Sequence, residues 1–312
     1  MNRFSNEDLS KFVDTSDEWI SKRSGIKYRH FVSENETTSE MAFMASKKAL
    51  ESANISKDDI DLIIVATTTP DNTFPSTANA VQKKLFTNAV SFDVQAVCAG
   101  FVFALSVAKS MMLDGFYKNC LVIGADSMSK LLDWSDRSTS VLFGDGAGAV
   151  VLQKISNKDN KYDDWGILSN VIQSDGNFYD ILKTNGGVST NQNTGHIEMA
   201  GKEVFKHAVD KLSISLEQAL KESNKKINQI DWLVPHQANQ RIILAVADRM
   251  KIDINKVVST VKDHGNTSAA SIPLALDNAI SSKKIFNGDL IGVHAIGGGL
   301  SWGASIIRIG KP

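Results

Sequence analysis

Two glycine-rich stretches, each followed by an apolar run, decide the fold. The first is FGDGAG at residues 143–148, which leads into AVVL at 149–152. The second is IGGG at residues 296–299, which precedes the apolar stretch ASIIRI at 304–309. Short apolar runs bounded by glycines are typical of buried strands. Each stretch therefore predicts a turn that feeds the last strand of an α/β unit.

The same glycines argue against a nucleotide site. A phosphate-binding or dinucleotide-binding loop follows a strand and opens a helix whose N-terminus holds the phosphate. Both stretches here lead into strand-like runs instead. The glycines therefore predict tight turns, or backbone N–H groups that approach a ligand.

Outward from these turns, the chain repeats one order of elements. Residues 39–53 and 204–220 carry apolar residues at helical spacing, and short apolar runs follow at 60–65 and 230–234. Helices that alternate with short strands predict a layered α/β protein, here one built by duplication. Two unrelated α/β halves are the alternative.

A charged and polar stretch at residues 154–164 marks the predicted junction. It divides the chain into an N-terminal half, residues 1–155, and a C-terminal half, residues 156–312.

Composition excludes several classes of protein. The 312 residues carry a net charge of −1, which favours neither nucleic acid nor a membrane surface as partner. No apolar run reaches the roughly 18 residues of a membrane span, and the N-terminus lacks the apolar core of a signal peptide. The two cysteines, Cys98 and Cys120, are not in metal-ligand spacing. We therefore expect a cytoplasmic protein without a disulfide scaffold or a metal site.

Cys98 is the candidate nucleophile. It follows a strand-like run at residues 90–94 and precedes an apolar helical run at 101–112. The dipole and free N–H groups of a helix N-terminus favour the thiolate, which is the nucleophilic form. An inert buried cysteine is the alternative, and Cys120, inside a strand-like run, is expected to be of that kind.

Two histidines stand in polar loops. His236 follows a predicted strand, and His264 opens the run HGNTSAAS at 264–271. Loops at the ends of buried strands are where α/β proteins place their sites. Together with Cys98 they suggest a nucleophile with polar partners, although a solvated loop histidine is the alternative. The other histidines are expected at the surface or in the core: His30, His196, His207 and His294.

Six segments, in one order along nearly the whole chain, resemble the β-ketoacyl-ACP synthase III family, which begins bacterial type II fatty-acid synthesis. They are DTSDEWI at 14–20, CAGF at 98–101, FGDGAG at 143–148, HQAN at 236–239, HGNTSAAS at 264–271 and GGG at 297–299. The resemblance implies a thiolase-like fold, with two duplicated α/β halves in α-β-α-β-α layers.

The resemblance also implies a two-step reaction without cofactor or metal. Cys98 would take the acetyl group from acetyl-CoA, with the backbone N–H groups of Cys98 and Gly298 as oxyanion hole. Malonyl-ACP would then lose carbon dioxide while His236 and Asn266 donate hydrogen bonds to its thioester oxygen. The resulting carbanion would attack the acetyl group and release acetoacetyl-ACP.

Binding residues follow from the same resemblance. Trp19 would stack on the adenine of CoA, although a packing anchor is the alternative. The other expected CoA contacts are Arg23 and Arg137 near the phosphates, Asn239 on the pantetheine arm and Phe205 in its tunnel. Phe74 would reach the acyl pocket of the partner subunit in a homodimer. The expected contacts with acidic ACP are Gln237, Lys206, Arg241 and Arg249, whose charged members are alternatively solvated surface charges.

The sequence departs from the family pattern in two places. The family usually begins with a strand inside the first sheet, whereas here the match starts near Asn6 and that strand is absent. Three interpretations stay open: a start further upstream, compensation by the N-terminal residues, or an impaired protein. Ile296 stands where relatives carry phenylalanine, which is expected to alter packing near Asn266.

The sequence thus predicts an enzyme that makes acetoacetyl-ACP. A related condensing enzyme with another acyl-CoA starter is one alternative, and a non-catalytic acyl-CoA-binding or ACP-binding protein is another. The length of the starter depends on packing that the sequence does not reveal.

Overall fold

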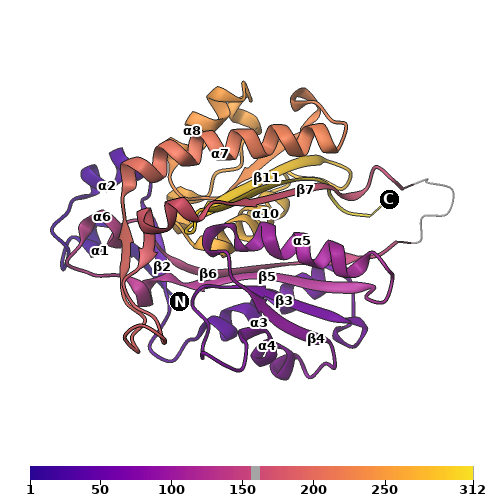
Figure 1. The fold of residues 1–312 in the computed structure, drawn as a ribbon, viewed down its shortest axis with the longest axis horizontal. Coiled ribbons are helices and arrows are strands. Elements are labelled where there is room, and N and C mark those ends of the chain that lie inside the picture. The colour runs from indigo at the N-terminus through magenta and orange to yellow at the C-terminus, as the bar shows by residue number, and fades with distance from the viewer. Residues whose placement is uncertain (156–161, 312) are drawn as a thin grey trace.

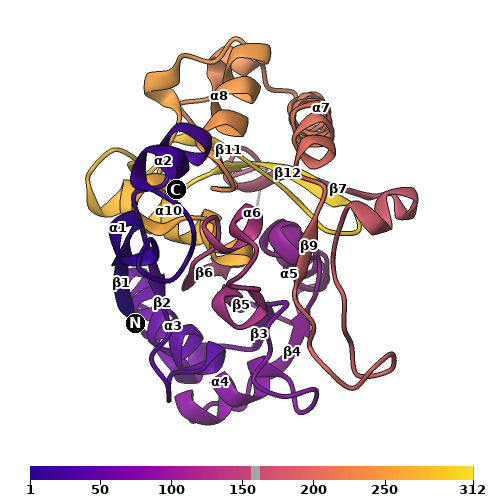
Figure 2. The same cartoon turned by 90° about the vertical axis from the view of Figure 1, so that its left-hand side faces the viewer.

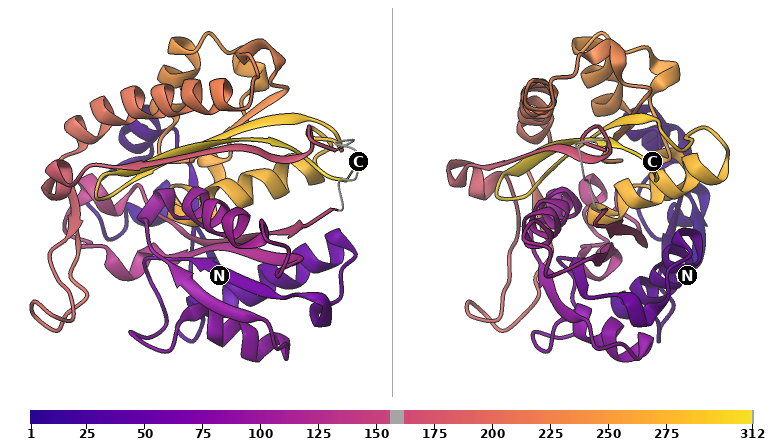
Figure 3. Two further views of the ribbon diagram at one scale, coloured as in Figure 1. Left: turned by 45° about the vertical axis from the view of Figure 1, so that its right-hand side comes forward. Right: turned by 90° about the vertical axis from the view of Figure 1, so that its right-hand side faces the viewer.

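The computed structural model describes residues 1–155 and 162–311 and has five layers, α-β-α-β-α (Figure 1). Two helices lie outside the first sheet, two lie between the sheets, and two cover the second sheet. Views from other sides show the same stacking (Figures 2 and 3). The thiolase-like arrangement expected from the resemblance is confirmed.

The first sheet is built from residues before the predicted junction. Its strands run in the order β4 (Val90–Val94), β3 (Leu62–Ala66), β5 (Asn119–Ser127) and β6 (Asp145–Gln153). The first three are parallel, and β6 is antiparallel to β5. Its outer face packs on α3 (Thr38–Ala53) and α4 (Thr77–Leu85), and each of these helices starts at a hydroxyl N-cap, Thr37 or Ser76.

The second sheet repeats this pattern after the junction. Its order is β10 (Trp232–Pro235), β11 (Leu290–Gly297), β12 (Ser301–Arg308) and β7 (Gly166–Ser174). The pair β10 and β11 is parallel, and β12 is antiparallel to β11, as β6 is to β5. Its outer face packs on α7 (Gly201–Glu222) and α8 (Gln240–Arg249).

Two helices fill the layer between the sheets. They are α5 (Gly100–Met112) and α10 (Ser271–Ser281), and both bury apolar side chains in one core with β3, β5 and β11. Burying a large apolar side chain contributes about 1.5–3 kcal/mol. Phe101, 1% exposed at the start of α5, is such a side chain, and Phe101→Ala is expected to cost about 3–5 kcal/mol. This layer carries the residues on which the chemistry depends.

The N-terminal segment differs from the sequence expectation. A strand is present at its start, β1 (Asn2–Ser5), but it pairs with β2 (Tyr28–Phe31) in a separate two-stranded sheet. Among the described residues, no strand pairs with the outer edge of β6, whereas β7 pairs with β12 in the second sheet. The strand missing from the first sheet is therefore missing in the structure too. The segment continues with α1 (Asn6–Leu9) and α2 (Asp17–Ser24).

The predicted junction lies partly outside the described residues, because 156–161 are not described. The division at 155/156 therefore stays a prediction. The second half also carries a short hairpin, β8 (Leu182–Thr184) and β9 (Ile197–Met199), which runs from the second sheet past α5 (Figure 2). Two further four-residue helices are α6 (Arg137–Ser140) and α9 (Val261–His264). No helix among the described residues has the length and apolarity needed to cross a membrane.

Candidate active site

Cys98 lies in a tight turn between the first sheet and the central layer. The turn is a 3-10 helix, η2 (Val97–Ala99), which follows β4 and runs directly into α5. Its first residue, Val97, has a left-handed backbone with φ of 48°, which is unusual for a β-branched residue. The turn places the Cys98 thiol at the start of α5, as predicted, and leaves the side chain only 5% exposed.

Burial changes the expected chemistry of this thiol. It raises the pKa of Cys98 to about 12, and the charge of Asp126 acts in the same direction. The Ser268 hydroxyl and the Asn266 amide act in the opposite direction. The sequence prediction that the helix N-terminus favours the thiolate is wrong for the unliganded site, because desolvation outweighs the helix dipole. The resting group is a thiol.

His236 is held as a neutral imidazole with a defined tautomer. Its Nδ1 lies 2.6 Å from Ser271 Oγ, and that oxygen also accepts a hydrogen bond from the Gln237 N–H at 3.3 Å. The Ser271 proton is therefore free to donate to Nδ1, which leaves the ring proton on Nε2. Burial, followed by the charge of His294, lowers the pKa of His236 to about 3. The ring is thus a neutral donor at physiological pH.

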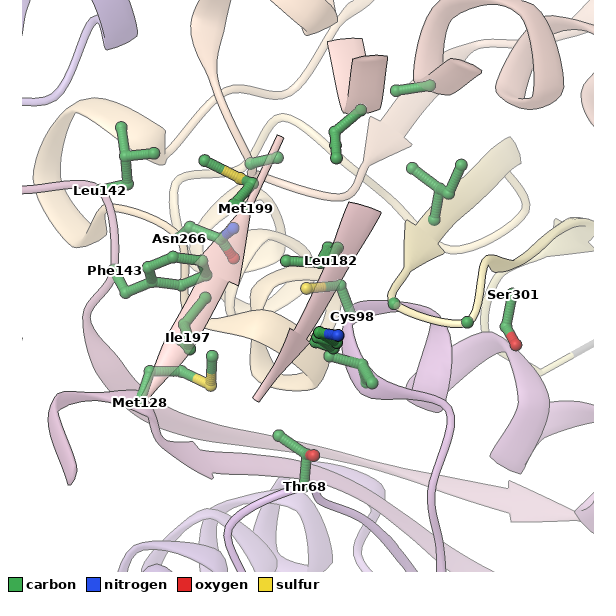
Figure 4. A pocket seen from close by; sticks show the side chains of 18 of the residues that line it. Thr68, Cys98, Met128, Leu142, Phe143, Leu182, Ile197, Met199, Asn266 and Ser301 are labelled. Atoms are coloured by element: carbon green, nitrogen blue, oxygen red, sulfur yellow. The ribbon is translucent and has the colours of Figure 1, made fainter. Parts of the chain in front are cut away.

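Asn266 is positioned by the segment that leads into β6. The turn predicted at residues 143–148 is wrong for most of that stretch, because β6 already begins at Asp145. The Asn266 N–H donates to the Leu142 carbonyl at 2.9 Å, and its own carbonyl accepts from the Gly144 N–H at 3.0 Å. A side chain at Gly144 would place Cβ 2.5 Å from the His264 carbonyl oxygen, so the close approach requires glycine. Asn266 Oδ1 accepts from the Ser268 N–H at 2.9 Å. The amide nitrogen is left to face the cavity (Figure 4).

The second glycine-rich turn lies against the backbone of the thiol residue. A Cβ at Gly297 would come within 2.6 Å of the Cys98 nitrogen, and one at Gly298 within 2.8 Å of the Leu182 carbonyl oxygen. Only glycine permits this approach. It brings the Gly298 backbone to the same cavity as Cys98, where the sequence predicted the oxyanion hole.

One cavity of about 470 Å³ joins these groups (Figure 4). Cys98, His236 and Asn266 all line it, so these residues from distant parts of the sequence meet in one cavity, whereas His264 does not line it. Most of the wall is apolar. It includes Leu182, Ile197 and Met199 of the hairpin, Met128, Leu142 and Phe143 of the first half, and Val204, Phe205, Ala208 and Ile242 on α7 and α8. Among residues 1–155 and 162–311, no group of three or more His, Cys, Asp or Glu side chains is placed to hold a metal ion.

The predicted CoA residues fall into two groups. Phe205 and Asn239 line the cavity. Trp19 lies outside it, with the guanidinium carbons of Arg23 and Arg137 at 4.3 Å and 5.1 Å from its ring centroid. The two groups adjoin, since the Asn239 side chain donates to the Arg23 carbonyl at 3.2 Å.

The predicted ACP contacts need one correction. Gln237 is 1% exposed, and both ends of its side chain are fully engaged with backbone groups of Pro235, Val258, Thr260 and Val261. It supports the fold beneath His236 and is not available to a docking protein. Arg241 and Lys206 are exposed, and the Arg241 guanidinium lies 5.6 Å from the Phe205 ring centroid.

Two further predicted residues lie outside the cavity. Arg249 is exposed and pairs with Asp210 at 2.9 Å. Phe74 is 83% exposed. The position of Arg249 is thus accounted for by an ion pair at the surface, and neither residue contacts the cavity.

Sequence reasoning missed several residues around the site. Ser268 and Ser271 lie within the run HGNTSAAS, so a search for partners of His236 in that run could have found Ser271. Asp126, buried at the end of β5, had no signal in the sequence. His294, which we expected at the surface or in the core, is buried beside His236, and neither ring nitrogen has a hydrogen-bond partner among the described residues.

Comparisons with known proteins agree with this geometry. The family model for 3-oxoacyl-[acyl-carrier-protein (ACP)] synthase III matches residues 92–176, and the model for its C-terminal part matches residues 220–309. The chain is 55% identical over 306 residues to β-ketoacyl-[acyl-carrier-protein] synthase III of Wolbachia pipientis wMel, covering 97% of this chain and 94% of the relative. The corresponding protein of Ehrlichia chaffeensis is 54% identical over 305 residues, with the same coverage.

Solved structures lead to the same family. The 3-oxoacyl-[acyl-carrier-protein] synthase III of Aquifex aeolicus VF5 superimposes with a TM-score of 0.92 at 45% identity, covering 99% of this chain and 96% of that one. The Thermus thermophilus enzyme gives a TM-score of 0.93 at 37% identity, covering 100% and 96%. The chain therefore belongs to the β-ketoacyl-[acyl-carrier-protein] synthase III family of condensing acyltransferases.

Proposed function

We propose that this protein condenses acetyl-CoA with malonyl-ACP to give acetoacetyl-ACP, CoA and carbon dioxide, the step that initiates fatty-acid synthesis. The observation that carries the proposal is the shared cavity: a thiol from the first half and two neutral donors from the second half line one space. Family membership supports the substrate classes, an acyl-CoA and an acyl-ACP.

In the first step, the Cys98 sulfur attacks the acetyl carbonyl carbon. A bond from sulfur to carbon forms, the bond to the CoA sulfur breaks, and the thiol proton is balanced by the proton that CoA takes up. The developing oxyanion would lie between the N–H groups of Cys98 and Gly298, because Gly297, the neighbour of Gly298, has no side chain and so approaches the Cys98 nitrogen closely. The high pKa of the resting thiol means that proton removal is part of this step.

In the second step, malonyl-ACP loses carbon dioxide and its thioester becomes an enolate. His236 Nε2–H and the Asn266 amide would donate hydrogen bonds to that oxygen. A neutral imidazole suits this role, and the pKa of about 3 keeps His236 uncharged across physiological pH. The enolate carbon then attacks the acetyl group, and the Cys98 sulfur leaves and takes up a proton.

A different starter is the second candidate. Two flexible methionines, Met128 and Met199, line the cavity, and so does Ile296, where the family resemblance leads us to expect phenylalanine. Methionine adapts its shape to irregular ligands. A branched or longer acyl-CoA is therefore the alternative first substrate, with the same chemistry.

Assembly and partners complete the proposal. Phe74, Phe86 and Val90 are exposed near the β4 edge of the first sheet, at 83%, 84% and 48%, which favours a homodimer through that edge. Lys206 and Arg241, exposed beside the cavity-lining residues of α7 and α8, would meet acidic ACP. Trp19, Arg23 and Arg137 would hold the nucleotide end of CoA. We also propose that the protein is cytoplasmic.

The test is intact-protein mass spectrometry after mixing with acetyl-CoA. The wild type is expected to gain one acetyl group, and Cys98→Ala to gain none. Cys120→Ala is the matched control, because that cysteine is equally buried but lies within β5. A second assay follows carbon dioxide release from malonyl-ACP with a panel of acyl-CoA starters. Acyl transfer without carbon dioxide release would contradict the condensing function, and binding of acyl-CoA with neither acyl transfer nor carbon dioxide release would favour a non-catalytic binding protein.

A further inference from the structure

Ser268 combines two unfavourable features next to the thiol. It opens a second 3-10 turn, η8 (Ser268–Ala270), with a left-handed φ of 49°. It is fully buried, and its hydroxyl has no hydrogen bond of ordinary geometry within the part of the chain that the structure describes. A left-handed residue with a side chain and an unpaired buried hydroxyl are each disfavoured in folding. Glycine at this position would avoid both the left-handed strain and the unpaired hydroxyl. The presence of serine therefore indicates a functional role.

The hydroxyl lies between two groups that respond to it. The η8 turn packs against η2, the turn that carries Cys98. Ala269, the next residue of η8, donates its N–H to Asp126 Oδ2 at 3.1 Å, so the turn that carries Ser268 contacts both the Cys98 turn and Asp126. The Ser268 hydroxyl lowers the pKa of both the Cys98 thiol and the Asp126 carboxyl. It therefore stands where it can donate its single proton to either group.

Asp126 does not need that proton. Its Oδ1 accepts hydrogen bonds from the Thr68 N–H at 2.7 Å and from the hydroxyls of Thr67 and Thr69 at 3.2 Å and 3.0 Å. Its Oδ2 accepts from the Ala269 N–H at 3.1 Å. These four donors satisfy the carboxylate and fix the η8 turn, so the Ser268 hydroxyl is free for the sulfur.

We propose that Ser268 activates the nucleophile: its hydroxyl donates a hydrogen bond to the Cys98 sulfur as negative charge develops there, and it screens that charge from Asp126. The inference deepens the proposed function and rests on Cys98 as the residue that takes the acyl group. Asp126 has two opposing effects in this arrangement. It holds the turn that aims the hydroxyl, and its own charge disfavours the thiolate.

The experiment is a pH titration of the Cys98 thiolate by its ultraviolet absorbance, with Cys98→Ala as the baseline. Ser268→Gly removes the hydroxyl and relieves the left-handed backbone, so it is expected to fold. Its titration midpoint is expected to rise, and alkylation of Cys98 by iodoacetamide at fixed pH to slow about three- to tenfold. Asp126→Asn is expected to lower the midpoint. Ser140→Ala, which removes another buried hydroxyl without a partner, is expected to change nothing.

Ser268→Ala separates the hydroxyl from the backbone. It also lacks the oxygen but keeps the β-carbon, so a raised midpoint in both variants assigns the effect to the hydroxyl. An unchanged midpoint in folded Ser268→Gly, or an unchanged or raised one in folded Asp126→Asn, overturns the proposal. In single-turnover mixing with acetyl-CoA, acyl transfer to Ser268→Gly is expected to slow by the same factor as alkylation. If the wild type takes no acyl group from any acyl-CoA, the proposed function fails, but the titration still decides the role of Ser268.

Discussion

The two short turns in the middle of the molecule are built alike but carry different chemistry. Each opens with a left-handed residue, Val97 in η2 and Ser268 in η8, with φ of 48° and 49°. Each runs directly into a central helix, α5 or α10. The second residue is Cys98 in one turn and Ala269 in the other. The two halves therefore share a backbone device, but the nucleophile is in the first and its polar partners are in the second.

The two sheets differ in a complementary way. In the second sheet, β12 pairs with β11 on one side and with β7 on the other. In the first sheet, β6 pairs with β5, and no other strand among the described residues pairs with its outer edge. Within the described chain, both sheets thus have four strands, but β7 extends the second sheet at an edge that has no strand partner in the first, and β4 extends the first sheet beyond β3. Cys98 follows β4, so the nucleophile comes from the strand that extends the first sheet.

The division of chemistry between the two halves is tested most strongly by removing the hydrogen-bond donors of the second half, His236 and Asn266. His236→Ala or Asn266→Ala is expected to keep acyl transfer to Cys98 but to slow carbon dioxide release about 10²- to 10⁴-fold. Mass spectrometry of the acyl enzyme and release of labelled carbon dioxide measure the two steps separately. Equal loss of both steps would show that the halves do not divide the chemistry.

Loss of the defined His236 tautomer is expected to lower the condensation rate by a smaller factor. Ser271→Ala removes the hydroxyl that bonds Nδ1, so the ring proton is no longer confined to Nε2. The loss of one hydrogen bond predicts about a tenfold fall in condensation rate, with acyl transfer unchanged. Ser215→Ala is the control, because that buried serine on α7 bonds only a helix carbonyl. A fall in acyl transfer as well would argue for a general disturbance of the fold.

The second half is also expected to be the acid-sensitive one. Burial lowers the pKa of His236 to about 3 and of His294 to about 4, so below about pH 6.5 the unfolded chain binds protons that the folded chain excludes. Stability is thus fully present above pH 6.5 and falls on acidification, by about 1 kcal/mol per pH unit for each histidine. Thermal unfolding between pH 7 and 5 measures this, and His294→Gln is expected to reduce the slope.

Buried carboxyl groups of the first half have the opposite effect on how stability depends on pH. Burial raises the pKa of Asp126 and Asp145, so these groups favour the folded state as the pH falls through their raised pKa values. The difference between wild type and His294→Gln isolates the histidine effect from theirs. If the unfolding temperatures of wild type and His294→Gln fall in parallel with pH, the acid sensitivity does not come from His294.

The smallest expected effect concerns the sheet edges. Outward-facing amides of β6 lack a strand partner among the described residues, whereas β12 is paired on both sides. Hydrogen exchange is therefore expected to be faster in β6 than in β12, because unpaired amides exchange through smaller local openings. Equal protection of the two strands would show that the β6 edge is covered in solution.

Much of the fold and of the site could be predicted from the sequence, because short-range patterns determine them. The glycine-rich stretches at the start of β6 and before β12, and the cysteine before an apolar helix, are local signals. Electrostatics and burial depend on distant neighbours and could not be predicted in this way. The helix N-terminus suggested a thiolate at Cys98, but the second half encloses the thiol and raises its pKa to about 12.

Gln237 and Ser271 show the same limit. Next to His236 in the sequence, Gln237 looks like a residue for docking, but its amide bonds the backbone of a loop that is twenty or more residues away. Ser271 lies 35 positions from His236 and still contacts its ring. Spacing along the chain carries no information about either contact.

The approach of Gly297 to the Cys98 nitrogen also affects how the chain acquires its reactivity. The groups that enclose the thiol, Ser268 and Gly297 among them, belong to the second half, which is synthesised after Cys98. Until that half folds onto the first, the Cys98 thiol lacks this enclosure and is open to oxidation and to electrophiles. The residues that bury this cysteine are made after it, so the thiol is more exposed to such damage during synthesis than in the folded protein.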